Sequence, residues 1–254
     1  NQSVALALAG AQVRHIGAIG VDGRWMAERL AEFGVECSAV AELAMASGHA
    51  IIEVDAAGEN AILIYPGANR AIAAPRVVQA LAAAQAGDWF ITQNETSAQA
   101  EAAAAAHAQG LSVAYSAAPF EAAAVRAVLP HVTLLIVNEV EAAQLCAEMG
   151  VALEDLPVPH LVVTLGARGA VWHDLGAGLA HETPAFPVTP VDTTGAGDTF
   201  AGYLIAVLSQ GLEPAAAMRR AAAAAALKVT RAGAADAIPA RDAVDAFLAD
   251  QPSE

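Results

Sequence analysis

The residues with the clearest potential for chemistry form the string Asp-Thr-Thr-Gly-Ala-Gly-Asp-Thr-Phe at positions 192–200. Two glycines flank an alanine just before an apolar segment, and small residues let the backbone turn its N–H groups into a concavity that binds anions. The N-terminus of the following helix adds partial positive charge. Asp198 ends this concavity and would repel an anion, unless it faces a hydroxyl group that loses its proton as a phosphoryl group arrives. A simpler alternative is that Asp198 or Thr199 caps the helix.

Short apolar runs alternate with alanine-rich segments along almost the whole chain, which predicts alternating strands and helices. Strands are predicted at 13–19, 49–54, 61–65, 88–92, 112–115, 131–137 and 161–165, with short strands and turns between 169 and 188. Helices are predicted at 4–11, 23–33, 75–86, 96–108, 121–128, 139–149, 197–209, 214–231 and 240–249. Repeated strand–helix units form a mainly parallel sheet with helices on both faces, a doubly wound α/β fold. Ligands of such sheets bind beyond the C-terminal ends of the strands.

Two features modify this regular pattern. The runs 49–54 and 61–65 surround Ala-Gly-Glu-Asn at 57–60, which predicts a hairpin that interrupts the alternation. Asp22 precedes the helix at 23–33 and can cap it.

Composition and charge exclude several functional classes. Twelve Lys and Arg against 27 Asp and Glu give a net charge of −15, which disfavours binding to nucleic acid or to an anionic membrane. No uninterrupted apolar run is long enough to predict a transmembrane helix. The two cysteines lie far apart, as expected of free thiols in a reducing cytoplasm. Lys228 is the only lysine and Val229 follows it, so a P-loop is excluded, and a protein kinase is equally disfavoured.

The string at 192–200 resembles the C-terminal signature of the ribokinase-like carbohydrate kinases, the phosphofructokinase-B family. Other family motifs follow in the same order. The matching segments are 1–5 (end of the first signature), 58–60, 67–69, 137–141 (N-x-x-E), 163–169 (T-L-G-x-x-G), 229–234 and 238–239. The resemblance implies a single α/β domain over residues 1–254, in which 49–65 is part of a small β lid. The family's first strand, the rest of its lid and several sugar contacts would precede Asn1.

The resemblance implies an ATP-dependent kinase that phosphorylates a sugar hydroxyl with Mg²⁺ and is stimulated by K⁺. The tail and lid motifs favour D-ribose, converted to D-ribose 5-phosphate. Asp198 would be the general base, and Gly195, Ala196 and Gly197 would donate amides to the transferred phosphoryl group. The alternatives are a kinase for another sugar or a nucleoside, and an inactive relative that only binds nucleotide or sugar. The intact Asp198 and Glu141 argue against an inactive relative.

The resemblance also assigns the nucleotide side of the site. Asn138 would contact phosphate and Glu141 would act on Mg²⁺ through water, since magnesium keeps much of its hydration. The same pair can equally be a helix cap with an acidic first turn. Residues that would border ATP are Thr164, Leu165, Gly166, Arg168 and Gly169, with Ala222 where family members place a histidine near the adenine. Arg168 can alternatively be an exposed arginine in a hairpin.

Sugar and cation sites follow from the same resemblance. Asn1, Glu95 and Asp198 would contact the sugar, although Glu95 can also be a solvated carboxylate at a helix start. The K⁺ site would comprise Asp192, Thr194, Lys228, Arg231, Gly233 and Ala237, mostly through backbone carbonyls, with Ala237 where the family often has serine. The expected assembly is a cytoplasmic homodimer joined through the lid, whose partners are a small sugar and ATP. Residues 1–254 alone are expected to bind nucleotide but to phosphorylate little sugar.

Overall fold

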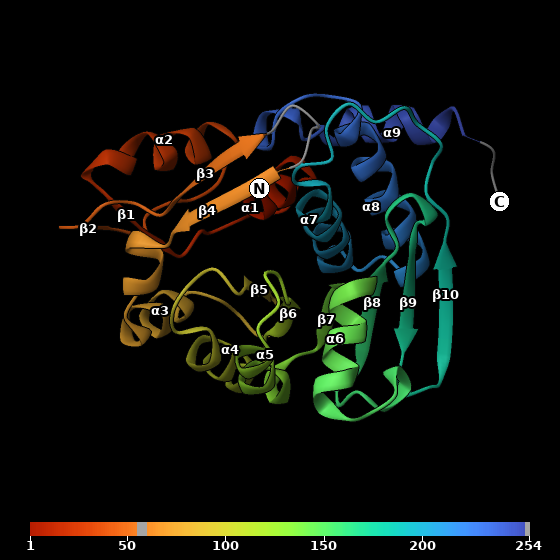
Figure 1. Cartoon of the computed structure of the whole chain (residues 1–254), viewed down its shortest axis with the longest axis horizontal. Helices are drawn as coiled ribbons and strands as arrows, with labels where there is room; N and C mark the ends of the chain where they lie inside the picture. The colour runs from red at the N-terminus through yellow and green to blue at the C-terminus, as the bar shows by residue number, and fades with distance from the viewer. Residues whose placement is uncertain (55–59, 252–254) are drawn as a thin grey trace.

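The computed structural model describes residues 1–54 and 60–251. Its centre is a six-stranded sheet in the order β10-β9-β8-β7-β6-β5 (Figure 1). Its strands are β5 (Trp89–Gln93), β6 (Ser112–Ser116), β7 (Leu134–Asn138), β8 (His160–Thr164), β9 (Ala170–Asp174) and β10 (Leu179–Thr183). Strands β5 to β8 pair in parallel, and β9 runs antiparallel to both of its neighbours. The predicted mainly parallel sheet is confirmed.

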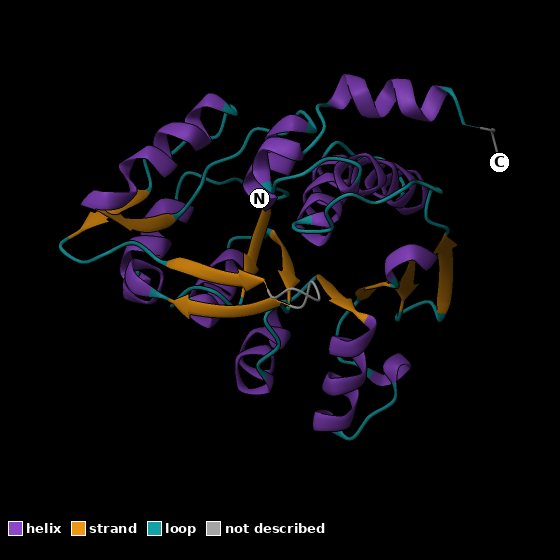
Figure 2. Ribbon diagram, turned by 45° about the horizontal axis from the view of Figure 1, so that its top comes forward, coloured by secondary structure: helices purple, strands orange, loops and turns teal. Residues whose placement is uncertain are grey.

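Helices cover both faces of this sheet (Figure 2). One face packs against α1 (Gln2–Leu8), α7 (Ala196–Ser209), α8 (Pro214–Val229) and α9 (Arg241–Ala249). The other packs against α3 (Ala74–Leu81), α4 (Gln99–Ala108), α5 (Ala122–Val128) and α6 (Glu139–Met149). The sequence of β7 is continuously apolar because both of its faces are buried. Leu134 and Ile136 belong to the core on the first face, and Leu135 and Val137 belong to the core on the second. Within residues 1–54 and 60–251, no helix is long and apolar enough to cross a membrane.

Two smaller sheets complete the fold. Strands β1 (Gly17–Gly20) and β2 (Val40–Leu43) form a parallel pair, joined through α2 (Arg24–Glu32). Strand β2 was not predicted, because its four residues include Glu42 and show no clear alternation. Strands β3 (His49–Val54) and β4 (Asn60–Tyr65) form the predicted antiparallel hairpin. Most of its predicted turn, 57–60, lies outside the described residues.

Several predicted boundaries differ from the structure. The helix predicted at 96–108 begins only at Gln99, since Ala98 has a left-handed backbone (φ 61°) that a helix cannot include. The helix predicted at 75–86 ends at Leu81. Asp22 was predicted to cap α2, but its carboxylate instead accepts hydrogen bonds from the backbone N–H and hydroxyl of Ser47. Asp22 therefore ties the start of the hairpin to β1.

Helix α1 lies against α7 at Gly202. A Cβ at Gly202 would lie 2.5 Å from Cβ of Ala5 and 2.9 Å from the carbonyl oxygen of Gln2, so only glycine allows the two backbones to approach this closely. Asp198 lies one turn earlier on α7. The contact therefore brings the start of α1 beside Asp198.

Candidate active site

Asp198, in the first turn of α7, receives hydrogen bonds from three amide side chains. Nδ2 of Asn1 donates to Oδ2 at 2.8 Å, whereas Nε2 of Gln2 and Nε2 of Gln93 donate to Oδ1 at 3.2 and 3.3 Å. Each carboxylate oxygen can accept about two such bonds, so Oδ1 is fully used while Oδ2 can accept one more. Oδ2 is therefore the oxygen that can accept a further hydrogen bond from a bound group.

The segment that follows β5 is held in place by Asn94, which is 1% exposed. Its Nδ2 donates to the carbonyl oxygen of Pro119 at 2.9 Å, and the hydroxyl of Tyr115 donates to its Oδ1. The residues on either side, Gln93 and Glu95, line the cavity beside Asp198. Burial raises the pKa of Glu95, and the negative charge of Asp198 raises it further. The two carboxylates are therefore close enough to interact electrostatically, and their joint role in a sugar site stays a prediction.

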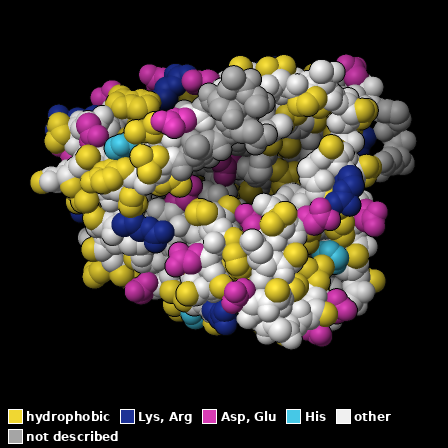
Figure 3. Space-filling model, viewed as in Figure 1, with side chains coloured by type: hydrophobic (Ala, Val, Ile, Leu, Met, Phe, Trp, Pro, Cys, Tyr) yellow, Lys and Arg dark blue, Asp and Glu magenta, His cyan; other side chains and the backbone are white. Residues whose placement is uncertain are grey.

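A cavity of about 1030 Å³ extends from these residues along the outer edge of β5. Its far wall is the chain at 11–16, just before β1. Figure 3 shows the molecule hollowed in the middle of the face seen in Figure 1. Polar residues such as Asn1, Gln93 and Glu95 line one part, and apolar residues such as Leu81 and Leu111 line another.

The small residues at 195–197 shape the start of α7. Gly195 has a left-handed backbone (φ 73°), which glycine adopts without strain. The N–H of Ala196 donates to the carbonyl oxygen of Thr193 at 3.1 Å, so this predicted phosphate donor already has a partner. The N–H groups of Gly197 and Asp198 lie in the first turn of α7, where a helix offers no acceptor. Nothing lies within 4 Å of the position that a Cβ of Gly197 would take.

Asn138 and Glu141 form a capping box at the start of α6. Oδ1 of Asn138 accepts from the N–H of Glu141 at 2.9 Å, and Oε2 of Glu141 accepts from the N–H of Asn138 at 2.8 Å. Burial raises the pKa of Glu141. Asn138 pairs in register with Thr164, so the ends of β7 and β8 present both residues at one edge of the sheet. The cap is thus present, and it leaves Oε1 of Glu141 available for other contacts.

The other residues predicted to border the nucleotide differ in their contacts and burial. Arg168 forms an ion pair with Glu139 at 2.6 Å, and both side chains are more than 60% exposed. Such a pair contributes about 0–1 kcal/mol, so a phosphate can displace Glu139 from Arg168 at small cost. Gly169 has φ 101°, and a Cβ there would lie 2.1 Å from the carbonyl oxygen of Thr183. Ala222 lies on α8 and is buried in the core. Leu165 and Gly166 form the turn between β8 and β9.

The predicted cation loop is held together around Asp192. Its Oδ1 accepts from the N–H of Thr194 and its Oδ2 from the N–H of Gly233, both at 2.9 Å. These bonds, that of Thr194 first, together with the charge of Lys228, lower the pKa of Asp192 to about 2. Nζ of Lys228 donates to the carbonyl oxygen of Asp192 at 2.9 Å. The N–H of Arg231 donates to the carbonyl oxygen of Lys228 at 3.1 Å. Ala237, the last predicted cation residue, is buried.

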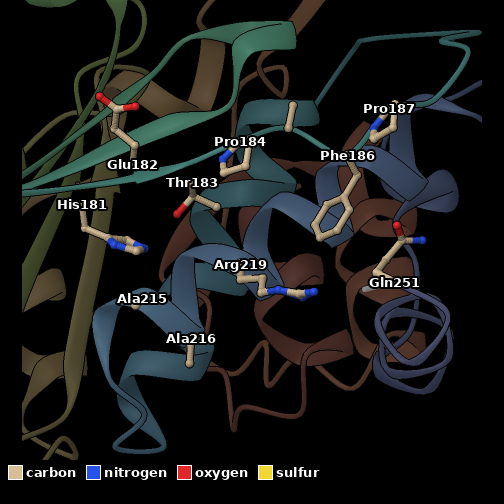
Figure 4. A pocket seen from close by; sticks show the side chains of 11 residues that line it. His181, Glu182, Thr183, Pro184, Phe186, Pro187, Ala215, Ala216, Arg219 and Gln251 are labelled. Carbon is tan, nitrogen blue, oxygen red and sulfur yellow. The ribbon is translucent and has the colours of Figure 1, made fainter. Parts of the chain in front are cut away.

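A second cavity, of about 390 Å³, lies between the end of β10 and α8 (Figure 4). Thr183, Phe186 and Arg219 are among the residues that line it. The three residues that donate hydrogen bonds to Asp198 do not line this second cavity, so we assign the cavity no part in the site.

Two residues of the site, Gln2 and Gln93, were not predicted. Gln2 directly follows Asn1 in the segment that resembles the family's first signature, and Gln93 alternates with Glu95 at the end of a strand. Both positions were therefore detectable, but only the fold shows that the two amides meet at one carboxylate oxygen.

Comparison with known proteins identifies the family. The pfkB family of carbohydrate kinases matches residues 1–241. The chain is 32% identical to a ribokinase of Bacillus subtilis, over 98% of this chain and 85% of the relative. A ribokinase structure from Thermotoga maritima has a TM-score of 0.87 at 30% identity, covering 98% of this chain and 86% of that one. For Arabidopsis thaliana ribokinase complexed with ribose and ATP, the TM-score is 0.83 at 26% identity, with 97% and 85% covered. The chain belongs to the pfkB family of carbohydrate kinases.

Proposed function

We propose that this protein transfers the terminal phosphoryl group of ATP to the 5-hydroxyl group of D-ribose. The observation that carries the proposal is the carboxylate of Asp198, whose Oδ2 accepts one hydrogen bond and can accept another, in the first turn of a helix that follows a glycine-rich loop. The ribokinase relatives support both the reaction and the sugar. The cavity beside Asp198, lined by Asn1, Gln93 and Glu95, offers hydrogen-bonding groups for a small polyol.

In this mechanism, Oδ2 of Asp198 accepts the proton of the sugar hydroxyl while the hydroxyl oxygen attacks the terminal phosphorus of ATP. The bond from that phosphorus to the bridging oxygen breaks, and ADP leaves with the bonding electrons. The amides of Gln2 and Gln93 orient the carboxylate through Oδ1. The free N–H groups of Gly197 and Asp198 stabilise charge on the transferred group, which is the main demand of phosphoryl transfer. Arg168, released from Glu139, provides a further positive charge for the nucleotide phosphates.

Glu141 is the residue that would hold Mg²⁺. Its Oε1 is not used by the capping box, and one carboxylate with several waters suits a magnesium ion. No group of three or more His, Cys, Asp or Glu in the described chain can hold a metal, which agrees with a site that relies on water and nucleotide oxygens. When bound, Mg²⁺ neutralises charge on the phosphates; Asn138 would orient the same phosphates from the start of α6.

A coupled assay of ADP release over a panel of acceptors tests the proposal. We expect the highest kcat/KM with D-ribose, and lower values with 2-deoxyribose, fructose and inosine. Asp198→Asn should lower kcat by about 10²- to 10⁴-fold, the usual effect of losing a general base. A preference for inosine would make the protein a nucleoside kinase. Because residues 1–254 alone are expected to phosphorylate little sugar, the assay is repeated with a protein extended before Asn1, and no turnover with any acceptor in either protein would contradict the kinase mechanism.

We also propose that the hairpin β3–β4 is a lid and that two copies associate through it. Ile51 and Leu63 are partners in register and are 53% and 69% exposed, with Tyr65 on the same face. An isolated two-stranded ribbon is barely stable in water, so this apolar face favours a partner. Figure 3 shows apolar side chains gathered on this part of the surface.

Sedimentation equilibrium tests the association. The wild-type protein should sediment as a dimer and Leu63→Arg as a monomer, while Val140→Arg, which alters an exposed apolar residue on α6, serves as the control and should remain a dimer. A monomeric wild-type protein at every concentration, or a dimeric Leu63→Arg, would refute this surface as the interface.

A further inference from the structure

Lys228, the only lysine of the chain, is fully buried in the last turn of α8. Burying a cation costs much free energy unless polar groups compensate it. The one hydrogen bond that the described structure gives its Nζ is to the carbonyl oxygen of Asp192, at 2.9 Å. Such a costly residue is best explained by a function of its charge.

The surroundings of Lys228 are those of a monovalent cation site. The carboxylate of Asp192 supplies negative charge, and the C-terminal end of α8 adds the partial negative charge of its carbonyl groups. The ammonium group contacts a backbone carbonyl oxygen, the kind of ligand that K⁺ also accepts in proteins. No carboxylate of the described residues lies within 4.0 Å of Nζ, so the ammonium is not simply one half of an ion pair.

The position of this charge matters because Asp192 connects two parts of the site. Its N–H donates to the carbonyl oxygen of Val229 at 3.1 Å, which joins the loop to the end of α8. Its carboxylate binds the N–H of Thr194, the residue before Gly195. A cation at Asp192 therefore both orders the loop and adds positive potential near the start of α7, where phosphate is expected.

We propose that the ammonium group of Lys228 takes the place of a bound K⁺ ion, so that the protein neither binds nor requires K⁺ at this loop. The sequence resemblance implied K⁺ stimulation with Lys228 as a backbone ligand; the buried side chain leads to a different expectation. A fixed positive charge at Asp192 repels a second cation from the same oxygens. The part of this proposal that concerns catalysis rests on the proposed kinase function, whereas the part that concerns ion binding does not.

The first test compares the wild-type protein in KCl, NaCl and tetramethylammonium chloride at constant ionic strength. The melting temperature should be the same in all three salts within about 1 °C, since no ion binds the native state specifically. Turnover with the best acceptor should change less than about twofold between KCl and NaCl, far from the tenfold that 1.4 kcal/mol of transition-state stabilisation would give. A K⁺-specific rise in melting temperature, or several-fold activation by K⁺, would overturn the proposal.

The second test removes the charge. Lys228→Met should melt at a lower temperature in NaCl and should regain stability in KCl or NH₄Cl, because these ions enter the vacated position. Its turnover should fall by about tenfold in NaCl and recover in KCl. Lys228→Gln repeats the test with a polar side chain in case the methionine variant does not fold, and Leu227→Met, at the adjacent position, controls for altered packing. A folded Lys228→Met with full activity and no response to K⁺ would refute the replacement. Loss of sugar phosphorylation in every salt would instead count against the proposed function, since the melting data need no sugar.

Discussion

Replacing Gly202 by alanine tests how the contact between α1 and α7 builds the site. The new Cβ would lie 2.5 Å from Cβ of Ala5, whereas carbon atoms in contact lie about 3.5–4.0 Å apart. The helices must therefore separate by about 1 Å, which as overpacking costs about 1–3 kcal/mol. Alanine also favours helix over glycine by about 1 kcal/mol, which offsets part of the cost. We expect a net loss of about 0–2 kcal/mol in the free energy of unfolding, measured by urea denaturation.

The effect on the site should exceed the effect on stability. A displacement of about 1 Å would lengthen the bonds from Asn1 and Gln2 to Asp198, now 2.8 and 3.2 Å, beyond the range of a hydrogen bond. We expect kcat/KM for ribose to fall by about thirtyfold in Gly202→Ala, as the loss of two hydrogen bonds of about 1 kcal/mol each predicts. Nucleotide affinity, measured by calorimetry, should be unchanged, since Asn138 and Glu141 lie on α6 and its cap.

A matched double variant separates crowding from any other consequence of the substitution. Ala5→Gly removes the methyl group that the new Cβ meets, so Ala5→Gly/Gly202→Ala should recover part of the lost activity, although the carbonyl oxygen of Gln2 still lies close. Wild-type stability together with wild-type kcat/KM in Gly202→Ala would show that the contact does not position the site. Equal activity in the single and double variants would show that Ala5 is not the cause of the defect.

Four further variants test individual groups of the site. Glu141→Gln preserves a capping box, so its unfolding free energy should stay within about 0.5 kcal/mol of wild type while the Mg²⁺ concentration for half-maximal activity rises about tenfold; unchanged Mg²⁺ dependence would leave Glu141 as a cap only. Asn138→Ala should lower the unfolding free energy by about 1 kcal/mol in the same urea experiment, and an unaltered midpoint would contradict the cap. The pKa of Glu95 is raised, so the folded state holds this proton more tightly than the unfolded state does. Below the ordinary pKa of 4.5, the wild type and Glu95→Gln should have the same unfolding free energy. As pH rises through the raised pKa, the wild type should become less stable than this variant. A constant difference between the two proteins across that range would refute the assigned shift. Gln93→Leu should lower kcat more than it raises KM for the sugar, because the amide contacts Asp198; the opposite split would make Gln93 a sugar contact.

Much of the fold could be predicted because most of its strands and helices have clear local sequence patterns. Helix α6 begins and ends where predicted, since Asn138 and Glu141 cap its start and Gly150 ends it in a left-handed backbone. Strand β2 could not be predicted, because only its pairing with β1 makes its four residues a strand. Nor does local sequence show that β1 and β2 form a sheet separate from the other six strands.

The candidate site divides in the same way. Asp198 and Asn138 lie in motifs that follow one another along the chain, so their types and spacing were sufficient to make them candidates. Lys228 was predicted as a backbone ligand of K⁺, but the contact of its side chain could not be predicted. The residue lies in an alanine-rich helix, and its Nζ donates to the carbonyl oxygen of Asp192, 36 positions away. Similarly, Arg168 was expected to contact a phosphate, and its partner Glu139 is 29 positions distant. Long-range contacts of side chains are what the sequence alone leaves open.

The outer edge of β5 has a consequence for how this chain behaves among other polypeptides. β5 ends the six-stranded sheet, and the cavity beside it separates it from the chain that leads into β1. The backbone N–H and C=O groups on that edge have no strand partner in the described chain, and apolar side chains such as Leu81 and Leu111 lie behind them. Such an edge is a template for strand addition, so an extended segment with alternating apolar residues would insert there and gain hydrogen bonds.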